Sequence, residues 1–308
     1  MSFLKLIRYQ NLLMLALMQL VFKYGFIDFQ GIPQALNHWQ YGLLVFATVC
    51  IAAGGYLINN IIDKETDEEN KPENVVIGNA ISETMGYNLY ISLNVIGLAL
   101  GFYIANIVGK PSFAAVFIII AMTLYVYANG LKQSLLIGNF IVAILLSLSI
   151  LIIPVFDLLP VIFPHNQVGM GIIFEIFIDY AVFAFVLNFI REIVKDLEDI
   201  KGDYNHGMNT LPIALGVART VKVVFGLSFI PIGFIIYYIN ENLFSNDLYY
   251  ASAYGFLLIL APLLYFTVKI LGAKNKKDFG HLSNVLKIVI FFGILSIAVI
   301  NWNILYAR

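Results

Sequence analysis

Long apolar stretches dominate this chain and restrict the folds open to it. A helix needs about 20 predominantly apolar residues to cross a bilayer, and nine stretches of roughly this length occur along the sequence. They are 9–26, 41–62, 87–108, 112–128, 133–155, 170–191, 218–240, 249–271 and 285–305. Hydrophobic residues make up 60% of the 308 residues and charged residues only 12%, so little of the chain remains for a soluble domain. The sequence therefore predicts an all-α, polytopic membrane protein with one integral-membrane domain over residues 1–308.

The basic residues indicate how these spans are oriented. If the N-terminus lies inside, all but three (Lys23, Lys110 and Arg308) of the 18 Lys and Arg residues fall toward the inner side of the alternating spans. Cytoplasmic loops carry such an excess of Lys and Arg, so the N-terminus is predicted to be cytoplasmic. The net charge of −1 argues against a nucleic-acid partner. The single cysteine, Cys50, excludes a disulfide framework within the chain.

More than half of the 19 acidic residues lie in two short segments, 59–73 and 191–203. Each segment follows an apolar stretch on the predicted cytoplasmic side. At about 100° per residue, the polar side chains of each segment share one helical face. These side chains are Asn59, Asp63 and Asp67 in the first segment, and Asp196, Asp199 and Asp203 in the second.

Carboxylates on one helical face repel each other unless a cation lies between them. Hard oxygen ligands without His or Cys select Mg²⁺ or Ca²⁺, and Mg²⁺ usually combines one or two carboxylates with water and substrate phosphate. Two such clusters suit a Mg²⁺-bound diphosphate that leaves an allylic carbon, with nearby Lys or Arg neutralising it. Either segment alone fits a solvated acidic loop, whereas their joint occurrence at cytoplasmic helix ends favours the metal site.

These residues resemble the signatures of the UbiA family of intramembrane prenyltransferases. The family's first signature, Asn-x₃-Asp-x₃-Asp, matches Asn59, Asp63 and Asp67, and its second, Asp-x₃-Asp, matches Asp199 and Asp203 with Asp196 upstream. Further similarity lies in Tyr127-x₄-Lys132 and in Thr210-Leu211-Pro212-Ile213 followed by Gly216. The resemblance extends over nearly the whole chain.

The resemblance implies nine helices around a central cavity open sideways to lipid, capped by the two acidic loops. It implies that Mg²⁺ is held by Asp63, Asp67, Asp196, Asp199 and Asp203. Lys132 would contact the donor diphosphate, and Asn59 and Tyr127 would border the reactive carbon. Further cations expected at the diphosphate are Lys71, Arg191 and Lys195. The implied partners are an isoprenoid diphosphate donor, a lipid-soluble or amphiphilic acceptor and the surrounding membrane lipid.

Two stretches of the sequence indicate which class of acceptor to expect. Asn70-Lys71-Pro72 and Arg191-Glu192-Ile193-x-Lys195-Asp196 look most like geranylgeranylglycerol-phosphate geranylgeranyltransferases, which move a prenyl chain onto a glycerol hydroxyl of an ether lipid precursor. Many family members with aromatic acceptors carry an arginine-rich stretch after the first signature, whereas here Lys71 is the only basic residue between Asp67 and the third span. An aromatic acceptor of quinone biosynthesis, 4-hydroxybenzoate or a naphthoate, remains the alternative.

Other classes of membrane protein fit less well. A transporter would place its charged residues near the bilayer midplane, whereas both acidic segments lie at one predicted face. A lipid synthase with a CDP-alcohol donor would need an Asp-x₂-Asp-Gly-x₂-Ala-Arg pattern, which is absent. Amides within the spans are expected to hydrogen-bond across helices. They are Asn94, Asn139, Asn188, Asn301 and Asn303, with a direct substrate contact as the alternative for Asn188.

Overall fold

The computed structural model describes residues 2–70, 72 and 75–306. Over these residues, nine helical segments are long and apolar enough to cross a membrane. The segments are Tyr9–Ile27, His38–Ile62, Glu83–Ile107, Pro111–Asn129, Ile137–Val161, Gln167–Asn205, Val217–Asn246, Tyr249–Ile270 and Lys276–Tyr306. No strand of a sheet occurs in the described ranges, so the predicted all-α, nine-span architecture is confirmed.

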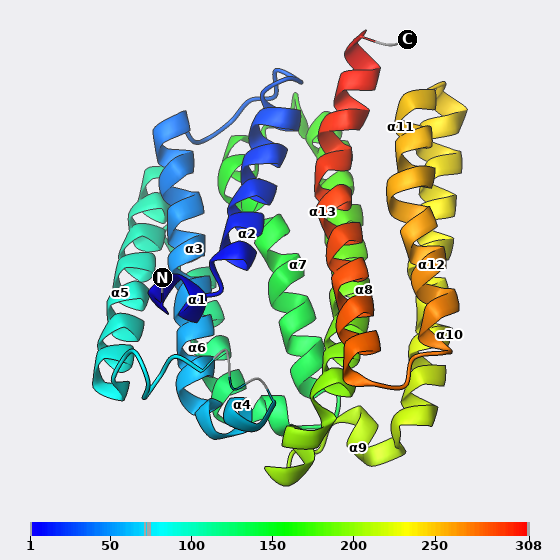
Figure 1. The fold of residues 1–308 in the computed structure, drawn as a ribbon. Helices are drawn as coiled ribbons and strands as arrows, with labels where there is room; N and C mark the ends of the chain where they lie inside the picture. Colours follow the sequence, from blue (N-terminus) through cyan, green and yellow to red (C-terminus); the bar gives the residue numbers. More distant parts are fainter. Residues whose placement is uncertain (1, 71, 73–74, 307–308) are drawn as a thin grey trace. The chain divides into compact units, whose positions relative to one another are not determined.

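Figure 1 follows the helices in chain order. The longer α-helices are α2 (Tyr9–Phe22), α3 (His38–Ile62), α5 (Glu83–Ile107), α6 (Ala114–Asn129), α7 (Ile137–Asp157), α8 (Gln167–Asn205), α10 (Val217–Tyr238), α12 (Ala261–Ile270) and α13 (Lys276–Tyr306). The short ones are α1 (Ser2–Leu6), α4 (Lys64–Asn70), α9 (Leu211–Leu215) and α11 (Tyr249–Tyr254). π-helical turns are η1 (Lys23–Ile27), η6 (Ile239–Leu243) and η8 (Gly255–Leu260), and 3₁₀ turns are η3 (Pro111–Phe113), η4 (Leu131–Gln133), η5 (Leu159–Val161) and η7 (Phe244–Asn246).

Two helices extend well beyond the predicted apolar stretches. α8 continues past residue 191 to Asn205, and α13 begins at Lys276 instead of residue 285. The predicted bounds stopped where charged residues begin, but Glu and Lys are good helix formers and a helix can continue beyond the hydrocarbon region. The second acidic segment therefore belongs to the same continuous helix as the sixth span.

The chain divides into two compact units. The first comprises the chain up to Gln19 with Pro33–Gly138 and Leu148–Asp179, and the second comprises Leu20–Ile32, Asn139–Ser147 and Tyr180–Arg308. The single domain expected over residues 1–308 stays a prediction.

In the first unit, α3 packs against both α5 and α6. Glycines allow this close approach, because a Cβ on Gly97 would lie 2.7 Å from Cδ1 of Ile51 and one on Gly55 would lie 2.9 Å from the Leu124 methyls. Small residues at helix contacts are typical of membrane proteins. The fully buried Asp157 accepts a 2.8 Å hydrogen bond from the backbone N–H of Leu36 and so ties the segment before α3 to the end of α7.

In the second unit, α12 packs against α10 and α13, and polar side chains connect neighbouring helices. Thr267 donates a 2.9 Å hydrogen bond to Ser228, and Asn303 accepts one of 2.9 Å from the backbone of Ala251. Such bonds satisfy polar groups that lipid cannot hydrate.

The prediction of cross-helix amide bonds is confirmed for three of the five amides. These three are Asn139, which donates to Asp196, Asn301, which donates to the carbonyl of Gly25, and Asn303. The prediction is wrong for Asn94 and Asn188. Each donates to the carbonyl four residues earlier in its own helix, at 2.9 and 2.8 Å.

Candidate active site

The first acidic segment crosses the junction between α3 and α4. Asp63 has φ −84° and ψ 4° and separates the two helices. Its N–H nevertheless donates to the carbonyl of Asn59, and the N–H of Asp67 donates to the carbonyl of Asp63, both at 2.8 Å. The four-residue hydrogen-bond repeat thus runs through the junction, which supports the predicted common face.

Three predicted residues meet at this junction and form what we call the first cluster: Asn59, Asp63 and Lys132. Nδ2 of Asn59 donates a 2.6 Å hydrogen bond to Oδ2 of Asp63, and the Lys132 ammonium forms an ion pair with Oδ1 of the same carboxylate. Only 8% of the Lys132 side chain and 14% of the Asp63 side chain are exposed, so solvent screens this pair weakly. Oδ1 of Asn59 is buried and has no hydrogen-bond partner among the described residues.

The turn that carries Lys132 folds closely against the start of α7. Lys132 lies in η4, and a Cβ on Gly138 would lie 2.8 Å from the Cα of Lys132 and 3.2 Å from its carbonyl oxygen. Between them, Leu136 adopts a left-handed conformation with φ +59°, which is strained for a residue with a Cβ. Glycine at 138 is therefore required for the backbone position that presents Lys132 to Asp63.

Three other predicted residues belong to the same part of the chain. Tyr127 lies in the last turn of α6 and Asp67 lies in α4, and both are half-buried. Lys71 lies outside the described residues.

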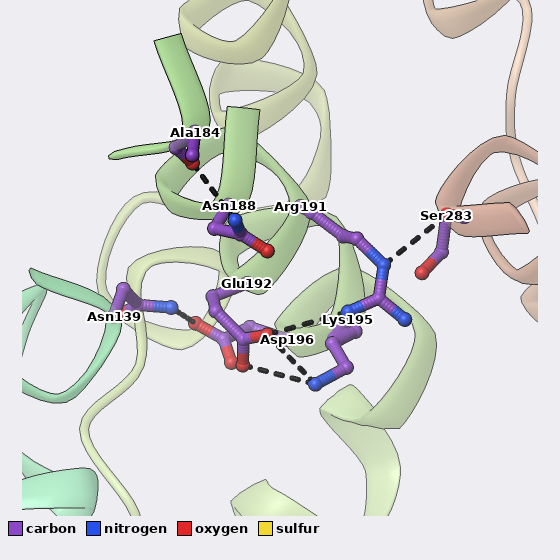
Figure 2. Close-up of polar contacts among 8 residues, drawn as sticks. All are labelled: Asn139, Ala184, Asn188, Arg191, Glu192, Lys195, Asp196 and Ser283. Atoms are coloured by element: carbon purple, nitrogen blue, oxygen red, sulfur yellow. Dashed lines mark hydrogen bonds and ion pairs between the residues drawn. The ribbon is translucent and has the colours of Figure 1, made fainter. Parts of the chain in front are cut away.

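The second acidic segment lies on α8, and Figure 2 shows polar contacts of its first residues, up to Asp196. Oδ2 of Asp196 accepts a 2.8 Å hydrogen bond from Nδ2 of Asn139 on α7. Lys195 approaches both carboxylate oxygens of Glu192, at 2.8 and 3.0 Å. We call this group, with Arg191, the second cluster. It combines two carboxylates with two cations on one helix.

Arg191 turns away from Asp196 in this cluster. Its Nε donates a 3.3 Å hydrogen bond to the backbone carbonyl of Ser283 on α13, and its Nη1 lies 3.7 Å from Oε1 of Glu192. Figure 2 shows the guanidinium pointing toward Ser283, on the opposite side of α8 from Asn139.

The remaining predicted acids lie nearer the end of α8. Oδ1 of Asp199 lies 4.0 Å from the ammonium of Lys276, and nearly half of the Lys276 side chain is exposed. Asp203 is buried. In both acidic segments, a lysine thus stands beside a carboxylate proposed to bind metal.

These residues suit a Mg²⁺ ion that is shared with a substrate phosphate. Within the described ranges, no three Asp, Glu, His or Cys side chains are grouped so that they could hold one metal ion. Mg²⁺ does not need such a cage, because one or two carboxylates plus substrate phosphate and water complete its shell. Asp63 and the buried, unpartnered Oδ1 of Asn59 offer hard oxygen donors of this kind.

Four residues of these contacts were absent from the predicted set: Glu192, Asn139, Lys276 and Ser283, which contributes its backbone carbonyl. Glu192 could have been found from its spacing, because residues three apart on a helix lie side by side and Lys195 follows it at that distance. Asn139 and Asp196 are 57 residues apart, and no local pattern connects them. The same holds for Lys276 and Asp199.

The sequence was compared with protein families and with individual known proteins. The model of the UbiA prenyltransferase family matches residues 24–303. A digeranylgeranylglyceryl phosphate synthase of Sulfolobus acidocaldarius is 33% identical over 196 residues, which cover 61% of this chain and 65% of that protein.

Solved structures share the fold. A digeranylgeranylglyceryl phosphate synthase structure superimposes with a TM-score of 0.64 at 22% identity and covers 97% of both chains. A UbiA homologue from Archaeoglobus fulgidus bound to GPP and Mg²⁺ superimposes with a TM-score of 0.63 at 17% identity and covers 96% of this chain and 99% of that one. Both likenesses extend over nearly the whole nine-span fold.

Proposed function

Because this chain belongs to the UbiA prenyltransferase family and is a membrane-embedded prenyltransferase, we propose that it moves a geranylgeranyl group onto a glycerol-phosphate ether lipid precursor. The observation that carries the proposal is the first cluster, in which Asn59 and Lys132 hold the Asp63 carboxylate from both sides. The matched relative from Sulfolobus acidocaldarius is named for this activity, which supports the choice of acceptor.

The donor diphosphate is assigned to the acidic segments. Mg²⁺ would be held by Asp63, Asp67, Asp196, Asp199 and Asp203. When bound, Mg²⁺ neutralises charge on the diphosphate as it leaves. GPP and Mg²⁺ in the Archaeoglobus fulgidus homologue support this assignment.

The cations of the chain neutralise the rest of the leaving group. Lys132 and Lys195 each stand beside a carboxylate, and each can turn an N–H toward phosphate oxygen when the diphosphate arrives. Lys71 is proposed as a further cation. The same role for Arg191 stays a prediction, and its Nε donates to the backbone carbonyl of Ser283.

The proposed reaction exchanges two C–O bonds at one carbon. The bond between C1 of the prenyl group and the diphosphate oxygen breaks, and its electron pair leaves with the diphosphate. The acceptor hydroxyl oxygen forms a new bond to C1 and then loses its proton, so the products are an ether, diphosphate and one proton. Asn59 and Tyr127 are proposed to border C1, where an aromatic face and an amide oxygen stabilise developing positive charge.

We place the N-terminus and both acidic segments at the cytoplasmic face, because most Lys and Arg residues fall on that side of the spans. A cysteine introduced at Lys201 in a Cys50→Ser background tests this orientation. A membrane-impermeant maleimide should label it only after inside-out vesicles are prepared, and labelling in intact cells would reverse the topology.

Release of pyrophosphate by the purified protein tests the function. Geranylgeranyl diphosphate and Mg²⁺ are supplied with geranylgeranylglyceryl phosphate, 4-hydroxybenzoate or a naphthoate. We expect release with the glycerol phosphate, its loss with EDTA, and its loss in Asp63→Asn. If pyrophosphate is released only with an aromatic acceptor, the protein is still a prenyltransferase, but it acts in quinone biosynthesis and not on an ether lipid precursor.

A further inference from the structure

Two cations of the second unit, Arg191 on α8 and Lys287 on α13, are near enough to repel each other. Arg191 on α8 acts electrostatically on the ammonium of Lys287 on α13, and it hydrogen-bonds to the carbonyl of Ser283. Ser283 and Lys287 are four residues apart and share one face of α13. Arg191 therefore lies against the face of α13 that carries Lys287.

Neither cation has a carboxylate of its own. The Arg191 side chain is 16% exposed, and its only described ion pair is a 3.7 Å contact with Glu192. Glu192 is already engaged by Lys195 at 2.8 and 3.0 Å. Lys287 is half-buried and forms no hydrogen bond or ion pair with any residue that the structure describes.

Such an arrangement is costly without an anion. An ionisable residue within a membrane span normally pairs with an opposite charge and marks a functional site, and adjacent like charges disfavour each other. A ligand with two negative charges would balance both cations. A phosphate monoester carries about −1.5 to −2 charge at neutral pH, whereas a carboxylate carries only one.

We infer that Arg191 and Lys287 form an anion subsite for the phosphate group of the acceptor. This inference rests on the proposed function. It assigns Arg191 to the acceptor, and it leaves the donor diphosphate to the carboxylate clusters and their lysines.

The position of the pair along α8 fits this division. Arg191 precedes Asp199 by eight residues, about 12 Å along the helix. α13 runs beside this stretch, because Lys276 approaches Asp199 and Ser283 approaches Arg191. The phosphate of the acceptor would therefore bind about two turns from Asp199.

The experiment compares Lys287→Gln with Lys277→Gln, a matched change at an exposed position on the same helix. Rates are measured with geranylgeranyl diphosphate and either geranylgeranylglyceryl phosphate or geranylgeranylglycerol, which has the same hydroxyl but no phosphate. Lys287→Gln should raise the KM for the phosphate acceptor about 10–100-fold, the effect of losing one charge-assisted hydrogen bond. The KM values for the alcohol and for the donor should not change, and Lys277→Gln should behave like the unmodified protein.

Two kinetic results would overturn the subsite. A rise in the KM for the donor would place the pair at the diphosphate, and an unchanged KM for the phosphate acceptor would leave Lys287 without a ligand. A lower melting temperature of ligand-free Lys287→Gln would also count against it, because removing one of two like charges should not destabilise the fold.

Thermal stabilisation by geranylgeranylglyceryl phosphate alone separates this inference from the proposed function. If geranylgeranylglyceryl phosphate raises the Tm of the unmodified protein more than that of Lys287→Gln, but no product forms, the subsite is supported and the proposed function is wrong. If geranylgeranylglyceryl phosphate raises the Tm of both proteins equally, and both form product with the same KM for this acceptor, the proposed function is supported and the subsite is wrong.

Discussion

Asn59 donates a 2.6 Å hydrogen bond to Asp63, and its own amide oxygen is buried without a partner in the described part of the chain. One amide thus fixes a carboxylate through its N–H and leaves an oxygen available for a cation or a developing positive charge. An aspartate at this position could not reproduce this arrangement, because an ionised carboxylate has no N–H to donate to Asp63.

Replacement of Asn59 by Asp should therefore impair the enzyme. The change removes the donor and places a second negative charge beside Asp63, and like charges this close repel strongly. We expect kcat/KM for the donor to fall at least about 10-fold, as for loss of a hydrogen bond to a charged group. Asn106→Asp is the control, because Asn106 is exposed and, within the described residues, its side chain donates only to the carbonyl of Phe102.

Lys132→Gln should cost both activity and stability. It leaves the largely buried Asp63 carboxylate without its cation, and loss of one partner from a buried ion pair typically costs about 3–5 kcal/mol. Thermal unfolding in detergent should show a lower Tm that millimolar Mg²⁺ partly restores, because the metal ion replaces the lost positive charge. If Mg²⁺ does not change the Tm of Lys132→Gln, Asp63 does not bind the metal ion.

Lys64→Gln provides the matched control for Lys132. Lys64 forms an exposed ion pair with Glu83 at 3.3 Å, and exposed pairs contribute only about 0–1 kcal/mol. We expect a Tm close to that of the unmodified protein and no dependence on Mg²⁺.

Gly138→Ala should displace Lys132 without removing any charge. The added Cβ would lie 2.8 Å from the Lys132 backbone, which cannot move aside as a flexible side chain can, and overpacking of this kind typically costs about 1–3 kcal/mol. We expect kcat/KM to fall about 10-fold or more. Gly130→Ala in the same turn has open space around it and should retain activity, whereas equal losses in both variants would point to general damage of the turn.

The sequence predicted the spans well because each is a long apolar run, and it placed Asn59 and Asp63 on one face because a four-residue spacing is a local property of helices. Lys132 was expected at the site only from the family resemblance, and its ion pair with Asp63 was not predicted. The sequence did not predict the end of α8 or the start of α13, because both helices extend through charged residues outside the apolar stretches. It predicted a cross-helix hydrogen bond for Asn139, but it did not predict that the partner is Asp196 or that Lys276 approaches Asp199. These partners on α8 are distant in sequence, and only the packing of whole helices brings them together.

Asn139→Ala should weaken the response to Mg²⁺. Asn139 is buried and gives Asp196 a 2.8 Å hydrogen bond from a different helix, so its loss leaves that carboxylate less firmly oriented. We expect the Mg²⁺ concentration for half-maximal rate to rise about 10-fold, consistent with one hydrogen bond to a charged group. Asn188→Ala removes only a bond to the carbonyl of Ala184 in the same helix, and its Mg²⁺ dependence should be unchanged.

Lys276→Gln should affect substrate binding more than stability. Its ammonium is 4.0 Å from Asp199, and the two side chains are 48% and 23% exposed, so the pair contributes at most about 1 kcal/mol to folding. The same lysine adds positive charge beside a carboxylate proposed to bind Mg²⁺ and the diphosphate. An exposed charge attracts an anionic substrate less as salt is raised. The variant should therefore keep its Tm, show a KM for the donor raised a few-fold at low salt, and approach the unmodified protein near 0.5 M KCl. A KM difference that persists at high salt would instead mean that Lys276 contacts the diphosphate directly.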